Sequence, residues 1–114
     1  MPNSLIEIGG EKRPVNFGRN FWAEVETLSG KTTSDIFKNF ASEIGSFKSQ
    51  VIITYSALKW GLYDDDKGTE PNPKFTQYKV AGWIDANPDV MDEVLKALTI
   101  SLPTKKKVEE SEVK

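Results

Sequence analysis

The chain has 114 residues, of which 38% are hydrophobic, 28% charged and 11% aromatic. This length and composition predict one small domain and exclude a collagen-like, disulfide-stapled or wholly disordered chain. With 15 basic and 17 acidic side chains, the net charge of −2 argues against bulk electrostatic binding of nucleic acid, and the absence of histidine and cysteine removes the commonest general base, thiol nucleophiles and the usual zinc ligands.

The first predicted element is a β-hairpin over residues 5–17. Its strands carry apolar side chains at Leu5, Ile6 and Ile8 and then, on alternate positions, at Val15 and Phe17. Gly9 and Gly10 between them supply the positive φ angles of a tight turn. Pro14 donates no backbone hydrogen bond and therefore suits an edge strand. A two-stranded hairpin is marginal in water, so it must pack on the rest of the domain.

An amphipathic helix is predicted over residues 20–29, with Asn20 as its N-cap and Gly30 as the left-handed residue after its end. Its apolar face comprises Phe21, Trp22, Val25 and Leu28. A second helix is predicted over residues 32–44, because Thr32 and Asp35 have capping-box spacing. The apolar face of this helix comprises Ile36, Phe37, Phe40, Ala41 and Ile44, and Gly45 ends it.

A central helix is predicted over residues 46–62, beginning at Ser46. Apolar residues at helical spacing form its expected buried face: Phe47, Val51, Tyr55, Leu58 and Leu62. The β-branched run Val51–Ile53 makes a strand the alternative. The long 3.6-residue period favours the helix.

The second half of the chain predicts a loop and two further helices. Residues 63–74 (YDDDKGTEPNPK) form the loop, Thr76 begins a short helix, and Asn87-Pro88 marks the start of a last helix that Pro103 ends. The predicted fold is α+β and mostly helical, with an N-terminal β-hairpin followed by about five α-helices around a single core. We expect one domain over residues 1–103 and a charged, disordered tail over 104–114.

Two segments invite a chemical interpretation, and each has a plainer one. Asp64-Asp65-Asp66 begins like a calcium-binding EF-hand loop, but Thr69 and Phe75 stand where that loop needs glycine and glutamate, which favours a solvated loop. Gly9-Gly10 lacks the spacing of a phosphate-binding loop and is predicted to be a turn.

The remaining side chains indicate a protein that works by binding. Seven aromatic residues can stack on bases, but their helical spacing without interleaved basic residues favours core packing: Phe17, Phe21, Trp22, Phe37, Phe40, Trp60 and Trp83. The acidic pairs Glu24/Glu26 and Asp92/Glu93 are expected on solvated helix faces. No serine, tyrosine or lysine stands in a recognisable catalytic spacing, so we expect neither catalysis nor a cofactor or metal.

The expected location is the cytoplasm. The start of the chain, MPNSLIEIGGEKRP, lacks the charged and then apolar stretches of a signal peptide. Apolar runs such as Val51–Ile53 fall far short of the roughly 20 residues that span a bilayer. A chain without cysteine suits a reducing compartment. We expect no binding to membranes or nucleic acid.

The chain resembles the tail assembly chaperones of long-tailed bacteriophages over residues 5–102. In the run IEIGGEKRPVNFGRNFWAEVETLSGKTTSDIF, a hairpin, an apolar-Phe-Gly step and an amphipathic helix are matched at Ile6, Ile8, Gly10, Val15, Phe17, Gly18, Glu26, Ser29 and Gly30. The segment ITYSALKWGL is similar to that family's helix end at Tyr55, Ala57, Leu58 and Gly61, and VAGWIDANPDVMDEVLKAL resembles its closing pair of helices. The pattern is diffuse and contains no invariant chemical signature, and the DDDKGTEPNP loop departs from many relatives.

The resemblance implies an assembly factor and not an enzyme. Such chaperones associate in the host cytoplasm with the long, helical, apolar tape measure protein. They keep it soluble until tail tube subunits polymerise around it, and they are not retained in the virion. Aromatic side chains dominate protein interfaces, so the candidate partner-binding residues are Trp22, Phe37, Phe40 and Trp60. The hairpin edge also makes a homo-oligomer possible.

Two other classes of function stay open at this point. One is a structural minor tail or connector protein that remains in the virion. The other is a small regulatory protein-binding module unrelated to phage.

Overall fold

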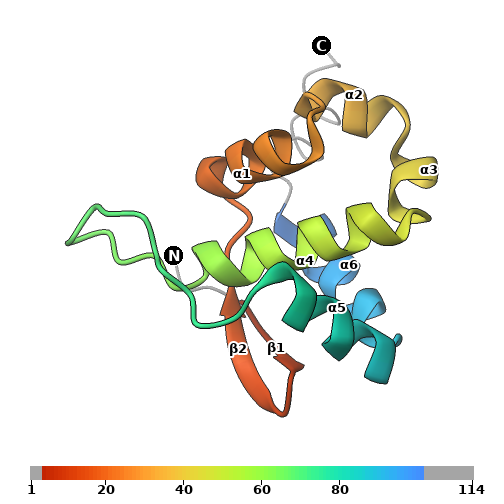
Figure 1. Ribbon diagram of the computed structural model, residues 1–114. Helices are drawn as coiled ribbons and strands as arrows, with labels where there is room; N and C mark the ends of the chain where they lie inside the picture. The colour runs from red at the N-terminus through yellow and green to blue at the C-terminus, as the bar shows by residue number, and fades with distance from the viewer. Residues whose placement is uncertain (1–3, 102–114) are drawn as a thin grey trace.

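A two-stranded antiparallel hairpin leads into helices that share one core (Figure 1). The computed structural model describes residues 4–101, and its elements are β1 (Ser4–Ile8), β2 (Glu11–Val15), α1 (Arg19–Ser29), α2 (Thr33–Lys38), α3 (Phe40–Ile44), α4 (Phe47–Trp60), α5 (Gln77–Ala86) and α6 (Val90–Ser101). The predicted class, α+β with an N-terminal hairpin and a mostly helical remainder, is confirmed. The predicted helix end at Pro103 and the predicted tail over 104–114 lie outside the described residues.

The hairpin forms around the predicted glycine turn. Gly9 and Gly10 have φ angles of 65° and 85°, and the register places Ile8 opposite Glu11. The second strand ends at Val15, so Phe17 lies beyond it. The apolar residues Ile6, Ile8 and Val15 are buried, which shows that the hairpin packs on the helices and does not stand alone.

Helix α4 forms the centre of the core. It includes the β-branched run Val51–Ile53, so this segment is a helix and not a strand. Figure 1 shows it crossing the middle of the molecule, with α1 above it and α5 below it. Strand β2 and helices α1, α3, α5 and α6 all contact it. The buried apolar side chains of the helices are Phe21, Val25, Ile36, Ile52, Ile53, Ala57, Leu58, Val80, Ile84, Val90, Met91, Val94 and Leu98.

Most helix ends follow from local side chains. The hydroxyl oxygens of Thr32, Ser46 and Thr76 each accept a hydrogen bond from the backbone N–H three residues later, as N-caps do. Gly30 has the predicted left-handed conformation after α1.

Two predicted helix starts are wrong. Helix α1 begins at Arg19 with Gly18 as its N-cap, two residues before the expected N-cap Asn20. The side-chain oxygen of Asn16 accepts a hydrogen bond from the N–H of Gly18 and fixes the approach to the helix. Helix α6 begins at Val90, since Asn87-Pro88 forms a hydrogen-bonded turn in which the N–H of Val90 donates to Asn87.

The single helix predicted over residues 32–44 is two short helices, so six helices are present in the described range. The break lies at Asn39, whose backbone angles, φ −118° and ψ 35°, are not helical. Its side-chain amide donates to the carbonyl of Asp35. Asparagine competes in this way with the helical backbone, which explains the separation of α2 from α3.

The predicted buried face of the central helix is wrong at both ends. Phe47 is 82% exposed and Leu62 is 47% exposed. The second half of α4 is enclosed by its neighbours and buries even polar residues, namely Thr54, Ser56 and Lys59. Periodicity predicts the width of an apolar arc but not which part of the helix its neighbours cover.

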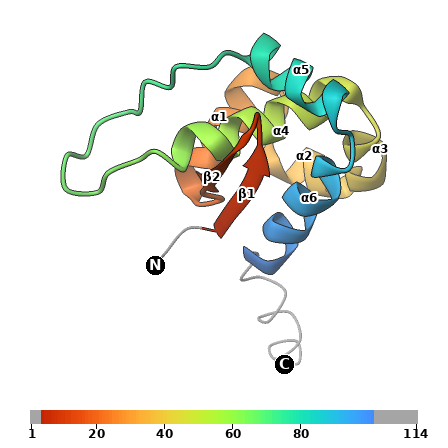
Figure 2. The same cartoon turned by 90° about the horizontal axis from the view of Figure 1, so that it is seen from below.

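The segment between α4 and α5 extends away from the body of helices, as Figure 2 shows from below. It contains the predicted acidic loop. No helix within residues 4–101 has the length and apolarity to cross a membrane.

Candidate functional site

The acidic loop is organised as a turn. The Asp64 carboxylate accepts from the N–H of Asp66 at 2.9 Å, and the Asp64 carbonyl accepts from the N–H groups of Lys67 and Gly68. Within residues 4–101, no group of three or more acidic side chains is arranged to hold a metal ion. The loop therefore gives no reason to assign a metal centre.

A buried lysine joins three segments of the fold. Lys59 on α4 donates from Nζ to Glu24 Oε1 of α1 at 2.9 Å and to Glu70 Oε2 of the α4–α5 segment. Trp60 Nε1 donates to the same Glu24 oxygen at 3.1 Å. Burial lowers the pKa of Lys59, but the hydrogen bonds that Lys59 donates to Glu70 and Glu24 outweigh this effect, so the pKa is raised. The raised pKa keeps Lys59 protonated, so its charge bridges the carboxylates of Glu24 and Glu70.

Two glutamates fix the short helices α2 and α3. Thr33 donates through both its N–H and its hydroxyl to Glu26 Oε2, at 2.7 Å each. Lys31 Nζ donates to the buried Glu43 at 2.6 Å, and Ser49 donates to its other oxygen at 2.8 Å. These bonds, foremost those from Thr33 and Lys31, lower the pKa values of Glu26 and Glu43.

The interpretation of Glu24 and Glu26 as solvated residues is therefore wrong, since both are hydrogen-bonded. Glu24 lies 35 residues from Lys59 along the chain and Glu26 seven from Thr33, so no spacing within one element indicated either contact. Within residues 4–101, these charged contacts join neighbouring elements of the fold. The remaining candidate sites are surfaces that can bind a partner.

The structure brings together three of the four predicted partner-binding aromatics. Trp22 lies 5.2 Å from Phe37, and Phe37 lies 6.1 Å from Phe40, between ring centres. Phe37 is 42% exposed, while Trp22 and Phe40 are partly buried. Trp60 lies elsewhere, 5.5 Å from Tyr63. Of the seven aromatics expected in the core, Phe21 is fully buried, five are partly buried and Phe37 is exposed.

The most exposed aromatic side chains lie where the sequence did not indicate a site. Phe47 is 82% exposed and Tyr78 is 89% exposed. A groove of about 290 Å³ between α4 and α5 is lined by Lys48, Val51, Gln77, Tyr78 and Ala81. We call this groove, together with Phe47 one helical turn before Val51, the α4–α5 surface. One feature of the sequence could have indicated the exposure of Phe47. Phe47 directly follows the N-cap Ser46, and the first turn of a helix can extend beyond the elements packed against the rest of the helix.

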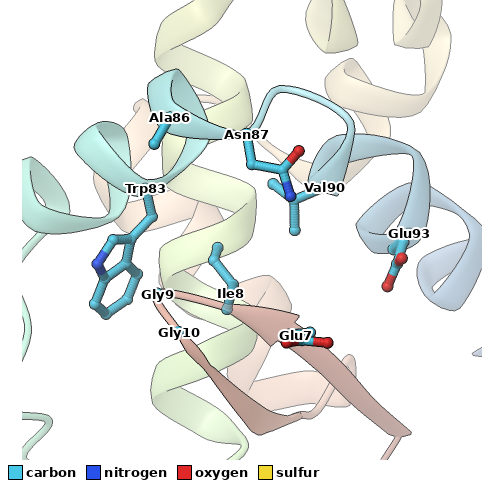
Figure 3. Close-up of a pocket in the computed structure, with 9 residues that line it drawn as sticks. All are labelled: Glu7, Ile8, Gly9, Gly10, Trp83, Ala86, Asn87, Val90 and Glu93. Atoms are coloured by element: carbon cyan, nitrogen blue, oxygen red, sulfur yellow. The ribbon is translucent and has the colours of Figure 1, made fainter.

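A second concave region lies between the hairpin turn and the α5–α6 junction. Its volume is about 460 Å³, and its lining residues are Glu7, Ile8, Gly9, Gly10, Trp83, Ala86, Asn87, Val90 and Glu93. Figure 3 shows Trp83 on one side of this hairpin cleft and the carboxylates of Glu7 and Glu93 on the other. Ile8 and Val90 lie between them and are buried.

The Trp83 ring is held in place by the hairpin. A Cβ atom on Gly9 would lie 2.4 Å from Trp83 Cε2, so the ring sits against the glycine backbone. The guanidinium carbon of Arg13 lies 4.4 Å from the ring centre, and Arg13 Nε donates to the Ile8 carbonyl at 3.0 Å. The apolar side of the cleft is therefore preformed.

Comparisons with protein-family models, curated proteins and solved structures give no match to this chain. Its function must be inferred from the exposed surfaces and from the sequence pattern of residues 5–102. The largest exposed aromatic groups on those surfaces belong to the α4–α5 surface.

Proposed function

We propose that this chain is a tail assembly chaperone of a long-tailed bacteriophage or prophage. In this proposal it binds the tape measure protein in the cytoplasm of the host bacterium, keeps it soluble and helps to recruit tail tube subunits, and it is absent from the finished virion. The observation that carries the proposal is the exposure of two large aromatic side chains, Phe47 and Tyr78, beside the groove of the α4–α5 surface.

The exposed rings offer enough apolar area to bind a partner. Burying one aromatic side chain removes at least about 150 Å² from water, worth roughly 4 kcal/mol at 25 cal/mol per Å² before the entropic cost of association. Two such rings on neighbouring helices can therefore dominate an interface. A chain that leaves both in water must tolerate that exposure or cover it with a partner.

The shape of the α4–α5 surface suits an amphipathic helix. The groove runs between two helices, and its lining combines the apolar residues Val51 and Ala81 with the polar residues Lys48 and Gln77. An apolar helix face docks into such a groove with polar groups around it. The resemblance supports the identity of the partner, because the tape measure protein bound by that family is long, helical and apolar.

The experiment is co-expression with the tape measure protein of the same tail gene cluster. The wild-type chain should keep that protein in the soluble fraction and copurify with it. The double variant Phe47→Ser/Tyr78→Ser should reduce recovery at least about tenfold, which corresponds to the loss of about 1.4 kcal/mol of binding free energy. Ile100→Ser is the matched control, since Ile100 is a large apolar residue on α6 that is 73% exposed and lies outside this surface.

The outcomes separate the function from the site. Failure of the wild-type chain to recover the tape measure protein would refute the proposed function. Full recovery by the Phe47/Tyr78 double variant would refute the α4–α5 surface as the site. Reduced recovery of the tape measure protein by Phe37→Ala would then favour the cluster of Trp22, Phe37 and Phe40 as the site. Mass spectrometry of purified virions distinguishes a chaperone from a tail component, because only the latter is present in the particle.

A further inference from the structure

We propose that the hairpin cleft is a second binding site, and that it takes a lysine or arginine side chain from an amphipathic segment of a partner protein. This inference rests on the geometry of the cleft and is independent of the chaperone proposal. The cleft has an acidic side formed by Glu7 and Glu93 and an apolar side formed by Trp83 and Ala86 (Figure 3).

The acidic side of the cleft is available to a cation. Glu7 and Glu93 come from β1 and α6, are exposed, and make no hydrogen bond or salt bridge with the residues that the structure describes. By contrast, the structural glutamates Glu24, Glu26 and Glu43 all have hydrogen-bond partners. Two unpaired carboxylates at one end of a cavity favour a positively charged group there.

The apolar side explains why a bare cation is not the best occupant. Ile8 and Val90 form an apolar floor between the carboxylates and the Trp83 ring. Lysine and arginine have the matching form, since an aliphatic stem lies on apolar surface while the charged head reaches a carboxylate. An apolar neighbour of that residue in the partner can contact Trp83, and the side-chain amide of Asn87 stands between the two sides for the partner's backbone (Figure 3).

The charge around the cleft selects the same occupant. Residues 80–95 contain four acidic side chains and no basic one: Asp85, Asp89, Asp92 and Glu93. All four are exposed. The single cation packed on the Trp83 ring, Arg13, is compensated by Glu11 at 3.2 Å. Lys12 lies opposite Glu7 in the hairpin register but forms no ion pair with it. Glu7 and Glu93 are the charged residues that line the cleft, and both favour a basic segment over an acidic one.

The test uses NMR of the indole N–H groups of the full chain, because its three tryptophans give separate reporters. Trp83→Phe assigns the signal of the cleft. The probe is a helical peptide of about 20 residues built from leucine, alanine and lysine, and the comparison peptide has glutamate in place of lysine. We expect the lysine peptide to shift the Trp83 signal and to leave those of Trp22 and Trp60 unchanged.

Charge-neutralising variants test whether Glu7 and Glu93 contribute to binding of the lysine peptide. Glu7→Gln/Glu93→Gln should raise the dissociation constant about threefold to thirtyfold at low salt, the effect of losing two partly exposed ion pairs. Asp65→Asn/Asp66→Asn is the matched control, because it makes the same change of net charge in the α4–α5 segment. This control should change the dissociation constant less than about twofold.

Several results would overturn this proposal. These are equal weakening by both double variants, equal binding of the glutamate peptide, absence of binding by the lysine peptide, or a shift confined to Trp22 or Trp60. A Trp83 shift that grows with protein concentration in the absence of peptide would replace the basic segment with a second copy of this chain.

Discussion

Replacing Gly61 with alanine tests the close approach of the end of α4 to the hairpin. Gly61 follows α4 with φ −65°, a conformation that alanine adopts easily, so backbone strain plays no part. The added Cβ would lie 2.0 Å from the carbonyl oxygen of Pro14 and 2.9 Å from the backbone nitrogen of Val15. Both atoms belong to the β2 backbone and cannot rotate away. The end of α4 and the strand must separate by more than 1 Å to reach ordinary contact.

The magnitude follows from this forced separation. Overpacking a well-filled core destabilises by about 1–3 kcal/mol, and we expect the upper end because the backbone hydrogen bond from Asn16 to Ala57 (3.1 Å) joins the same two segments. A loss of about 3 kcal/mol lowers the melting temperature of a domain of this size by roughly 10–20 °C.

Gly82→Ala is the matched control, because it makes the same chemical change where nothing opposes it. Gly82 lies within α5, and a Cβ there would meet no atom within 4 Å apart from its chain neighbours and the backbone of its own helix. Alanine in place of glycine in a helix interior stabilises by about 0.8–1 kcal/mol. The two substitutions should therefore shift stability in opposite directions.

Urea unfolding followed by circular dichroism measures both free energies of unfolding. The Gly61 variant should unfold at lower urea and the Gly82 variant at higher urea than the wild type. A Gly61→Ala protein as stable as the wild type would show that α4 and β2 do not approach as closely as described, and the reasoning would fail.

Two further predictions concern pH and the hairpin turn. The pKa values of Glu26 and Glu43 are lowered in the folded state, so the stability they contribute is present above their ordinary pKa of 4.5 and is lost as the pH falls through the folded-state values. The pKa of Lys59 is raised, so its contribution is present below the ordinary pKa of 10.5 and is lost as the pH rises through the folded-state value. Melting temperatures should therefore decline at both ends of a pH series, and an unchanged acid decline in Glu43→Gln would contradict the role of that residue. Gly9→Ala should destabilise more than Gly10→Ala, because both residues have positive φ but only a Cβ added at Gly9 would lie 2.4 Å from the Trp83 ring. Equal losses of melting temperature in the two variants would contradict this contact.

Local signals in the sequence predicted the local features of the fold. The glycine turn, the caps at Thr32, Ser46 and Thr76, and the general order of hairpin and helices depend on residues near one another in the chain. The break at Asn39 is also local, but a continuous apolar period hid it.

Features that depend on several elements at once could not be predicted in this way. The burial of Lys59 requires carboxylates from α1 and from the α4–α5 segment. The exposure of Phe47 depends on which part of α4 packs against α5. The hairpin cleft forms because α6 packs against β1. The family resemblance led us to predict a partner-binding surface, and the sequence could not indicate which of the candidate aromatic residues face water.

The pairing of β1 with α6 has a consequence for the order in which the core closes during synthesis. The two elements lie near opposite ends of the described chain and are in contact (Figure 2). A ribosome releases β1 before α6. Ile6 and Ile8 belong to the same buried cluster as Val90 and Val94, so they lack these α6 side chains until α6 has emerged. Completion of this core therefore requires the synthesis of α6, and a chain halted before α6 would present its hairpin to the cell's proteases and general chaperones.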